Sequence, residues 1–97
     1  MNIFNHYQDV IKKLLLDEKE KKNIFLPENL NSISVETPPK KFNCDFSTNF
    51  AMILSKVNEK SPMDIAENFK DLLLKLNDIS EVSIVKPGFI NVKLSKN

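Results

Sequence analysis

Near the start of the chain, apolar residues recur every three or four positions. They are Ile3, Tyr7, Val10, Ile11, Leu14 and Leu15. This spacing puts one apolar stripe along an α-helix, so the pattern predicts an amphipathic helix over about residues 3–19. Asn2 stands where an N-cap side chain is favoured. The lysines near the other end suit the negative end of the helix dipole, and a phosphate-binding patch is the alternative interpretation.

Residues 30–36 alternate between apolar and polar positions, with Ile33 and Val35 on one side. A period of two predicts a β-strand with one buried face. Two prolines follow, and a proline cannot donate a hydrogen bond to a β-ladder. Residues 37–41 are therefore predicted to form the loop that ends this strand.

A second helix is predicted to follow Asp45 and to run to about Val57. Asp45 is placed to accept a hydrogen bond from the amide of Thr48, so we expect it to cap this helix. A third helix is predicted from Ser61, which serves as N-cap before a proline and an acidic residue. Its apolar stripe is Ile65, Ala66, Phe69, Leu72, Leu73 and Leu76, and Asn77 is expected to close it.

The last part of the chain predicts a β-hairpin with strands at about Val82 to Val85 and Phe89 to Leu94. Residues 86–89 have proline second and glycine third, as in a type II turn. A longer loop is the alternative, because type II turns match the twist of hairpins less well. The order helix, strand, helix, helix, hairpin indicates an α+β domain. Three helices would pack on one face of a small antiparallel sheet and leave the other face open to a ligand.

The final strand points to a function. Side chains alternate across a strand, so Ile90, Val92 and Leu94 belong to the core face. The opposite face would carry Phe89, Asn91, Lys93 and Ser95. An aromatic ring, an amide and a cation in a row suit stacking a base, hydrogen bonding to its edge and holding a phosphate. Pro87 and Gly88, the only glycine, would form the turn that presents this strand, with Lys86 as a further phosphate contact.

Length and composition limit the classes of protein to which the chain can belong. With 97 residues, 41% apolar and 28% charged, the chain is typical of one soluble domain, and we expect a monomer. The first six residues do not resemble a signal peptide and no apolar run could span a bilayer, so we expect a cytoplasmic protein with no membrane role.

Cys44, the only cysteine, cannot form an internal disulfide and fits a reducing compartment. His6 lacks partners at ligand spacing, so we expect no metal site.

The charge balance argues against strong independent binding to RNA. Fourteen basic and thirteen acidic residues leave a net charge of +1, whereas nucleic-acid binders usually have a clear basic excess. The fourteen are all lysines, so the bidentate fork of arginine is absent. Any RNA contact of this chain alone is expected to be weak and dependent on salt.

Five short motifs, spread over nearly the whole chain, together resemble those of a known family in their order and spacing. They are Asn2-Ile3-Phe4, Val35-Glu36-Thr37-Pro38, Asp45-Phe46-Ser47-Thr48-Asn49 followed by Ala51, Leu54 and Lys56, then Pro62 with Ala66, and Pro87-Gly88-Phe89-Ile90-Asn91. In these the chain resembles the N-terminal additional domain of bacterial-type arginyl-tRNA synthetase. Cys44 is a departure, since the family usually has glycine before the aspartate.

The resemblance implies a domain that holds the elbow of tRNA(Arg) at the D-loop, where an unstacked base, conventionally numbered twenty, is recognised. It implies that Phe89 stacks on or buttresses this base and that Asn91 hydrogen-bonds its edge. Lys86 and Lys93 as phosphate contacts are our own extension. The parent enzyme would be an arginine-tRNA ligase that uses ATP and arginine and has catalytic and anticodon-binding domains.

This chain has neither the His-Ile-Gly-His nor the Lys-Met-Ser-Lys type of signature, so it should not aminoacylate and needs no cofactor by itself. We expect residues 1–97 to be one domain of the larger synthetase. One alternative is a structural or protein-interaction module in which Phe89 contacts a protein surface. A small hydrolase is disfavoured, because there is no arginine and no glycine-rich loop to hold an anion.

Overall fold

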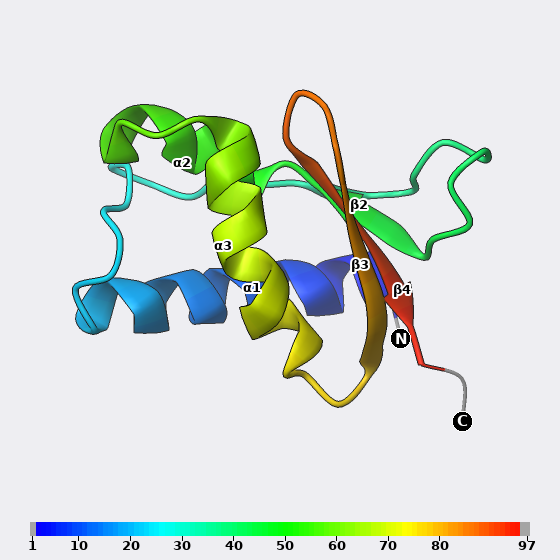
Figure 1. Cartoon of the computed structure of the whole chain (residues 1–97). Coiled ribbons are helices and arrows are strands. Elements are labelled where there is room, and N and C mark those ends of the chain that lie inside the picture. Colours follow the sequence, from blue (N-terminus) through cyan, green and yellow to red (C-terminus); the bar gives the residue numbers. More distant parts are fainter. Residues whose placement is uncertain (1, 96–97) are drawn as a thin grey trace.

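In the part of the chain that the structure describes, three helices and four strands follow in the order α1, β1, β2, α2, α3, β3, β4 (Figure 1). The computed structural model describes residues 2–95, so Met1, Lys96 and Asn97, at the ends of the predicted domain, lie outside the described residues. The elements span Ile3–Glu20 (α1), Val35–Glu36 (β1), Phe46–Thr48 (β2), Phe50–Asn58 (α2), Pro62–Leu74 (α3), Ile79–Val85 (β3) and Phe89–Leu94 (β4).

The four strands form one sheet in the order β1-β2-β4-β3, and every neighbouring pair is antiparallel. The final strand β4 therefore lies inside the sheet, between β2 and its hairpin partner β3. The helices lie on one side of the sheet, and the loop between β1 and β2 projects on the other side (Figure 1). The predicted α+β fold with helices on one face is confirmed.

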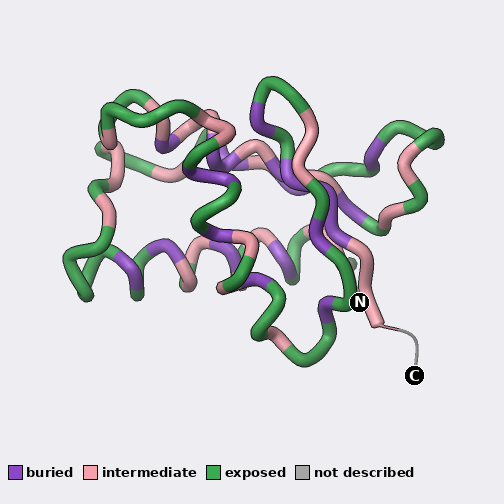
Figure 2. Tube along the Cα trace, in the orientation of Figure 1, coloured by how far each residue is buried: buried purple, intermediate pink, exposed green. Residues whose placement is uncertain are grey.

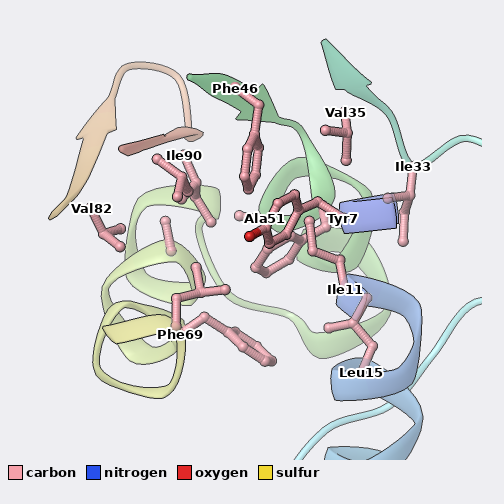
Figure 3. Close-up of a cluster of buried hydrophobic side chains, with 14 of the residues drawn as sticks. Tyr7, Ile11, Leu15, Ile33, Val35, Phe46, Ala51, Phe69, Val82 and Ile90 are labelled. Atoms are coloured by element: carbon pink, nitrogen blue, oxygen red, sulfur yellow. The ribbon is translucent and has the colours of Figure 1, made fainter. Parts of the chain in front are cut away.

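The core lies between the sheet and the helices (Figure 3). Tyr7 of α1 stacks on Phe46 of β2, with ring centroids 4.8 Å apart, and neither ring has much contact with solvent. Phe50 and Phe69 join α2 to α3 edge to face, with centroids 5.1 Å apart. Buried positions recur along α1 and α3, as the apolar stripes predict (Figure 2). One aromatic pair thus holds α1 on the sheet, and the other holds α2 and α3 together.

Tyr7 also makes a polar contact at the edge of this core. Its hydroxyl donates a hydrogen bond to Oδ2 of Asp78, in the turn between α3 and β3. Burial of the ring raises the pKa of the Tyr7 hydroxyl, and the hydrogen bond to Asp78 raises it further. The phenol therefore stays neutral in the folded protein well above the pH at which a free tyrosine ionises.

Two predicted helix caps are present, and the end of α1 is close to its predicted position. Oδ1 of Asn2 accepts from the amide of Phe4 at 2.9 Å, and α1 ends at Glu20. Oγ of Ser61 accepts from the amide of Asp64 at 3.1 Å and caps α3. Helix α3 ends at Leu74, however, so the prediction that Asn77 closes it was wrong.

Asp45 does not cap the second helix as predicted. Residues 46–48 form strand β2, and Asn49 occupies the N-cap position of α2. Oδ2 of Asp45 instead accepts from the amide of Leu94 at 2.7 Å, and its own amide donates to the carbonyl of Val92 at 2.8 Å. Asp45 thus satisfies backbone groups at the C-terminal end of β4, just before β2 begins. A three-residue strand is too short for its period to show in the sequence.

The first strand is shorter than the predicted residues 30–36. Ile33 is buried as expected, but the side chain of Asn49 takes the place of a partner strand beside it. Oδ1 of Asn49 accepts from the amide of Ser34 at 2.8 Å, and its Nδ2 donates to the carbonyl of Ser32 at 3.0 Å. Backbone groups satisfied by a side chain do not extend the ladder, so β1 contains only Val35 and Glu36.

Candidate nucleic-acid interface

A polar row crosses the face of the sheet that the helices leave open. The register pairs Glu36 with Ser47, Ser47 with Asn91, and Asn91 with Ser83, one residue from each strand. Residues directly opposite each other on antiparallel strands share a face. The row is therefore continuous from β1 to β3, and Asn91 lies at one of its two inner positions.

The turn before β4 differs from the predicted type II turn over residues 86–89. The amide of Gly88 donates to the carbonyl of Val85 at 2.9 Å, so the turn closes one residue earlier. The Lys86–Pro87 peptide bond is cis. Gly88 has a φ of +150°, and a Cβ atom there would lie 2.5 Å from Cβ of Pro62. Only glycine fits this position, where the turn meets the start of α3.

Phe89 follows this turn and is 40% exposed on the open face. Together with Asn91 it lines a pocket of about 230 Å³. The other lining residues are Glu36, Thr37, Pro39 and Ser47. The structure thus brings Phe89 and Asn91, both predicted from the alternation of β4, into one concave site.

Asn91 is much less accessible than the sequence suggests. It was expected to stand on the solvent side of the strand, yet it is only 2% exposed. The expectation failed because β4 is an inner strand, so side chains of β2 and β3 flank Asn91 on both sides. Thr37 and Pro39, from the loop after β1, line the same pocket. Asn91 forms the floor of the site rather than an exposed edge.

The amide oxygen of Asn91 has no hydrogen-bond partner among the described residues, although it is fully shielded. A buried acceptor without a partner is uncommon in folded proteins. Asn91 lines the pocket, but this oxygen is itself shielded, so the unpaired acceptor lies beneath the surface of the site.

The two lysines predicted to hold phosphate do not line this pocket. Nζ of Lys93 lies 3.9 Å from Oε2 of Glu81, which neutralises part of its charge, and its side chain is 30% exposed. Lys86 is exposed in the turn. Phosphate contacts from these residues would therefore be made around the pocket, not inside it.

Sequence reasoning missed Glu36, Ser47, Thr37 and Pro39 as parts of the site. The alternation of residues 33–36 already separates Glu36 from the core residue Val35. No signal connected that strand to β4, because the intervening β2 was not recognised. The pairing of Ser47 with both Glu36 and Asn91 is what brings them together.

Cys44, the departure from the family pattern, causes no backbone conflict. Positive φ values outside glycine occur at Lys22 and Glu59 among the described residues, and Cys44 is not one of them. Its thiol is free and half-buried. The position before Asp45 therefore has no conformational need for glycine in this chain.

Two negative findings apply to the part of the chain that the structure describes. No helix within residues 2–95 is long and apolar enough to cross a membrane. Within the same residues, no three His, Cys, Asp or Glu side chains gather closely enough to hold a metal ion.

Comparisons with known proteins agree on one family. The model of the arginyl tRNA synthetase N terminal domain matches residues 5–94. The arginine–tRNA ligase of Pelagibacter ubique is 47% identical over 94 residues, which are 96% of this chain and 16% of that protein. The ligase of Rickettsia akari is 38% identical over 94% of this chain and 15% of its own length. That of Bartonella quintana is 38% identical over 100% of this chain and 17% of its own length. No solved structure gives a significant match.

Proposed function

This chain belongs to the arginyl tRNA synthetase N-terminal domain family, and we propose that it binds the D-loop at the elbow of tRNA(Arg). The chain spans about a sixth of the length of the curated relatives it matches. Aminoacylation of tRNA with ATP and arginine is accordingly proposed for a parent enzyme that also has catalytic and anticodon-binding domains. In this proposal residues 1–97 are one cytoplasmic, monomeric domain that is not itself an enzyme.

The observation that carries this proposal is the pocket shared by Phe89 and Asn91. An aromatic ring that is 40% exposed stands beside a buried side-chain amide that lines the same pocket. Single-stranded bases bind proteins by stacking on exposed rings and by hydrogen bonds to their edges. Both kinds of group are present in one site, on the face that no helix covers.

Each group has a role in the proposal. The Phe89 ring stacks on the unstacked D-loop base, and Asn91 hydrogen-bonds the base edge from the floor of the pocket. Gly88 and Pro87 hold the strand at the angle that presents Phe89. Lys86, and Lys93 when it leaves Glu81, contact phosphates beside the pocket, where their charge contributes affinity without sequence preference.

Titration of the isotope-labelled chain with a tRNA(Arg) transcript tests the proposal by NMR, with a non-cognate tRNA for comparison. Shifts centred on Phe89, Asn91 and their neighbours in β4 are expected with the cognate RNA. Phe89→Ala should weaken binding by about 1–3 kcal/mol, the scale of one base-stacking contact. Binding should also weaken as salt rises, because phosphate contacts release counterions.

Phe25→Ala is the matched control for this variant. Phe25 is 73% exposed and lies in the loop after α1, outside the pocket. The same loss of one exposed ring there should leave RNA binding unchanged. Equal losses from both variants, or no loss from Phe89→Ala, would contradict a stacking role for Phe89.

A further inference from the structure

We propose that the loop after α1, with Phe25 as its anchor, docks this domain onto another domain of the parent synthetase. The docking partner presents an apolar surface with carboxylates at its edge. This inference rests on the parent enzyme of the proposed function, but it does not depend on the RNA site. It assigns a role to a surface that neither the pocket nor the core uses.

Phe25 is the most exposed large apolar side chain among residues 2–95, with 73% of its surface in contact with solvent. Its neighbours Ile24 and Leu26 are half-buried and pack against the core. These two side chains hold the segment on the domain, while the ring between them lies in water. The ring contributes little to the stability of this domain alone, because apolar surface stabilises a fold only when it leaves water.

The backbone of Phe25 is fixed by one side chain, that of Asn58 at the end of α2. Oδ1 of Asn58 accepts from the amide of Phe25 at 2.9 Å, and Nδ2 donates to the carbonyl of Phe25 at 2.9 Å. Nδ2 also donates to the carbonyl of Leu54 within α2, at 2.9 Å. These bonds use both donor hydrogens of the amide group. The loop is therefore held to α2, and Phe25 has a fixed backbone position before any partner binds.

A fixed and exposed ring suits an interface between protein domains. Ordering a loop at an interface costs free energy, and a loop that is already ordered avoids part of this cost. Phenylalanine is also enriched at the centres of protein interfaces relative to the rest of the surface. The ordered loop around Phe25 therefore has the properties of a docking element.

A shallow groove of about 470 Å³ beside the ring shows the chemistry that a partner needs. Its lining residues are Ile24, Phe25, Leu26, Lys19 and Lys22. Neither lysine takes part in an ion pair among residues 2–95. The complementary surface is therefore apolar at its centre, with carboxylates where it meets the two lysines.

RNA is the other class of ligand that a ring beside two lysines could bind. Two lysines can neutralise few phosphates, so they supply little of the electrostatic attraction on which RNA binding depends. The apolar side chains on both sides of the ring match the centre of a protein interface instead. The observations therefore favour a protein partner.

The parent enzyme supplies such a partner in the same chain. This chain covers 15–17% of the lengths of the three arginine–tRNA ligases named above, so most of each relative lies outside it. Linkage in one chain gives the partner a high effective concentration, so a small contact is enough for docking. The loop after α1 lies beside α2, at the end of the molecule away from the β1–β2 loop that borders the RNA pocket (Figure 1). Docking there leaves the pocket free for tRNA.

Hydroxyl-radical footprinting tests the inference in the full-length synthetase that contains residues 1–97, with the isolated chain as the reference. The radical oxidises exposed aromatic side chains, so it reports on Phe25 and Phe89 in one experiment. Oxidation of Phe25 should fall by about fivefold from the isolated chain to the full-length enzyme, because an interface anchor is shielded from water. Oxidation of Phe89 should be the same in both and should fall only when tRNA(Arg) is added.

Phe25→Ala shows whether the ring holds the docked state. In the wild-type full-length enzyme, Lys19 and Lys22 should be protected from acetylation, and Phe25→Ala should restore the rate found in the isolated chain. Leu74→Ala is the matched control, since Leu74 is 39% exposed at the end of α3 and does not line the groove. It should leave both lysines protected. Protection that persists in Phe25→Ala would refute the anchor role.

The isolated Phe25→Ala and Leu74→Ala chains should keep the circular dichroism of the wild type, because both side chains are exposed. The bonds from Asn58 also remain in Phe25→Ala, since they involve only the backbone of that residue. A change in the full-length enzyme alone therefore reports on docking and not on folding of this domain.

The outcomes separate this inference from the proposed function. Equal oxidation of Phe25 in the isolated chain and the full-length enzyme would refute the docking surface, and the RNA site would stand if tRNA(Arg) protects Phe89. Protection of Phe25 by the parent, without protection of Phe89 by tRNA(Arg), would support docking and refute the RNA site. Protection of Phe25 by tRNA(Arg) in the isolated chain would show that the loop contacts RNA, and would overturn the docking proposal.

Discussion

The two faces of the sheet contain the same residue types and use them differently. Phe46 on the helical face is fully buried and stacks on Tyr7, whereas Phe89 on the open face is 40% exposed beside a pocket. The helical face also buries an unpartnered hydroxyl, Thr48, and the open face buries an unpartnered amide oxygen, Asn91. The type of side chain alone therefore does not show whether a residue contributes to stability or to binding. The difference arises because helices cover one face of the sheet and leave the other face open.

The largest effect that tests this contrast is truncation of the buried ring. Phe46→Ala should lower the free energy of unfolding by about 3–5 kcal/mol, because it removes a fully buried ring and leaves a cavity under Tyr7. Phe89→Ala should lower it by less than about 1 kcal/mol. Urea unfolding followed by circular dichroism measures both, and similar losses would show that the open face is not free of stabilising packing.

Gly88→Ala should be the next most destabilising change. The added Cβ meets Pro62 at 2.5 Å, and the φ of +150° is strained for alanine. Steric strain and overpacking together should cost about 2–4 kcal/mol. Thermal unfolding measures the loss.

Lys86→Ala gives a comparison for the Gly88 variant, because Lys86 is exposed in the same turn. It should cost less than Gly88→Ala. A wild-type melting temperature for Gly88→Ala would mean that the turn moves away from α3 at little cost.

Replacing the two unpartnered polar groups should stabilise the protein on both faces. Thr48→Val removes the hydroxyl within a nearly unchanged shape, and Asn91→Leu replaces the buried amide. Each should raise the free energy of unfolding by about 1 kcal/mol, because a shielded acceptor without a partner is costly. Only Asn91→Leu should also weaken binding to tRNA(Arg), because Asn91 lines the pocket. Destabilisation by Asn91→Leu would indicate that the amide is already satisfied in solution, for example by water.

The fold class, all three helices and the hairpin follow from the sequence, because their periods extend over enough residues to be read. The site follows only in part. Alternation in β4 identifies Phe89 and Asn91, but the burial of Asn91 depends on which strands flank it. The order of the strands depends on β2, and its three residues are too few for an alternation of apolar and polar positions to be recognised. Because β2 was not predicted, Asp45 was wrongly expected to cap a helix, and Glu36 was not recognised as part of the site.

The smallest predicted effect concerns the link between α1 and the edge of the sheet. Tyr7→Phe keeps the ring stacked on Phe46 and removes the hydroxyl that donates to Asp78. At neutral pH the loss should be about 1 kcal/mol, the net value of one hydrogen bond, since Asp78 is exposed and water can replace the donor.

The pH dependence of this difference identifies its cause. The pKa of Tyr7 is raised in the folded protein, first by burial and then by the hydrogen bond to Asp78, so the folded state holds the proton more tightly than the unfolded state. The contribution is complete below about pH 10, the usual pKa of tyrosine, and declines above it by up to about 1.4 kcal/mol per pH unit. Wild type should therefore keep its advantage over Tyr7→Phe at about pH 9 and lose it between about pH 10 and 11, while the titration of the lysines cancels in the difference. A constant difference across that range would mean that the Tyr7 hydroxyl ionises freely in the folded chain, and that neither burial nor Asp78 protects it.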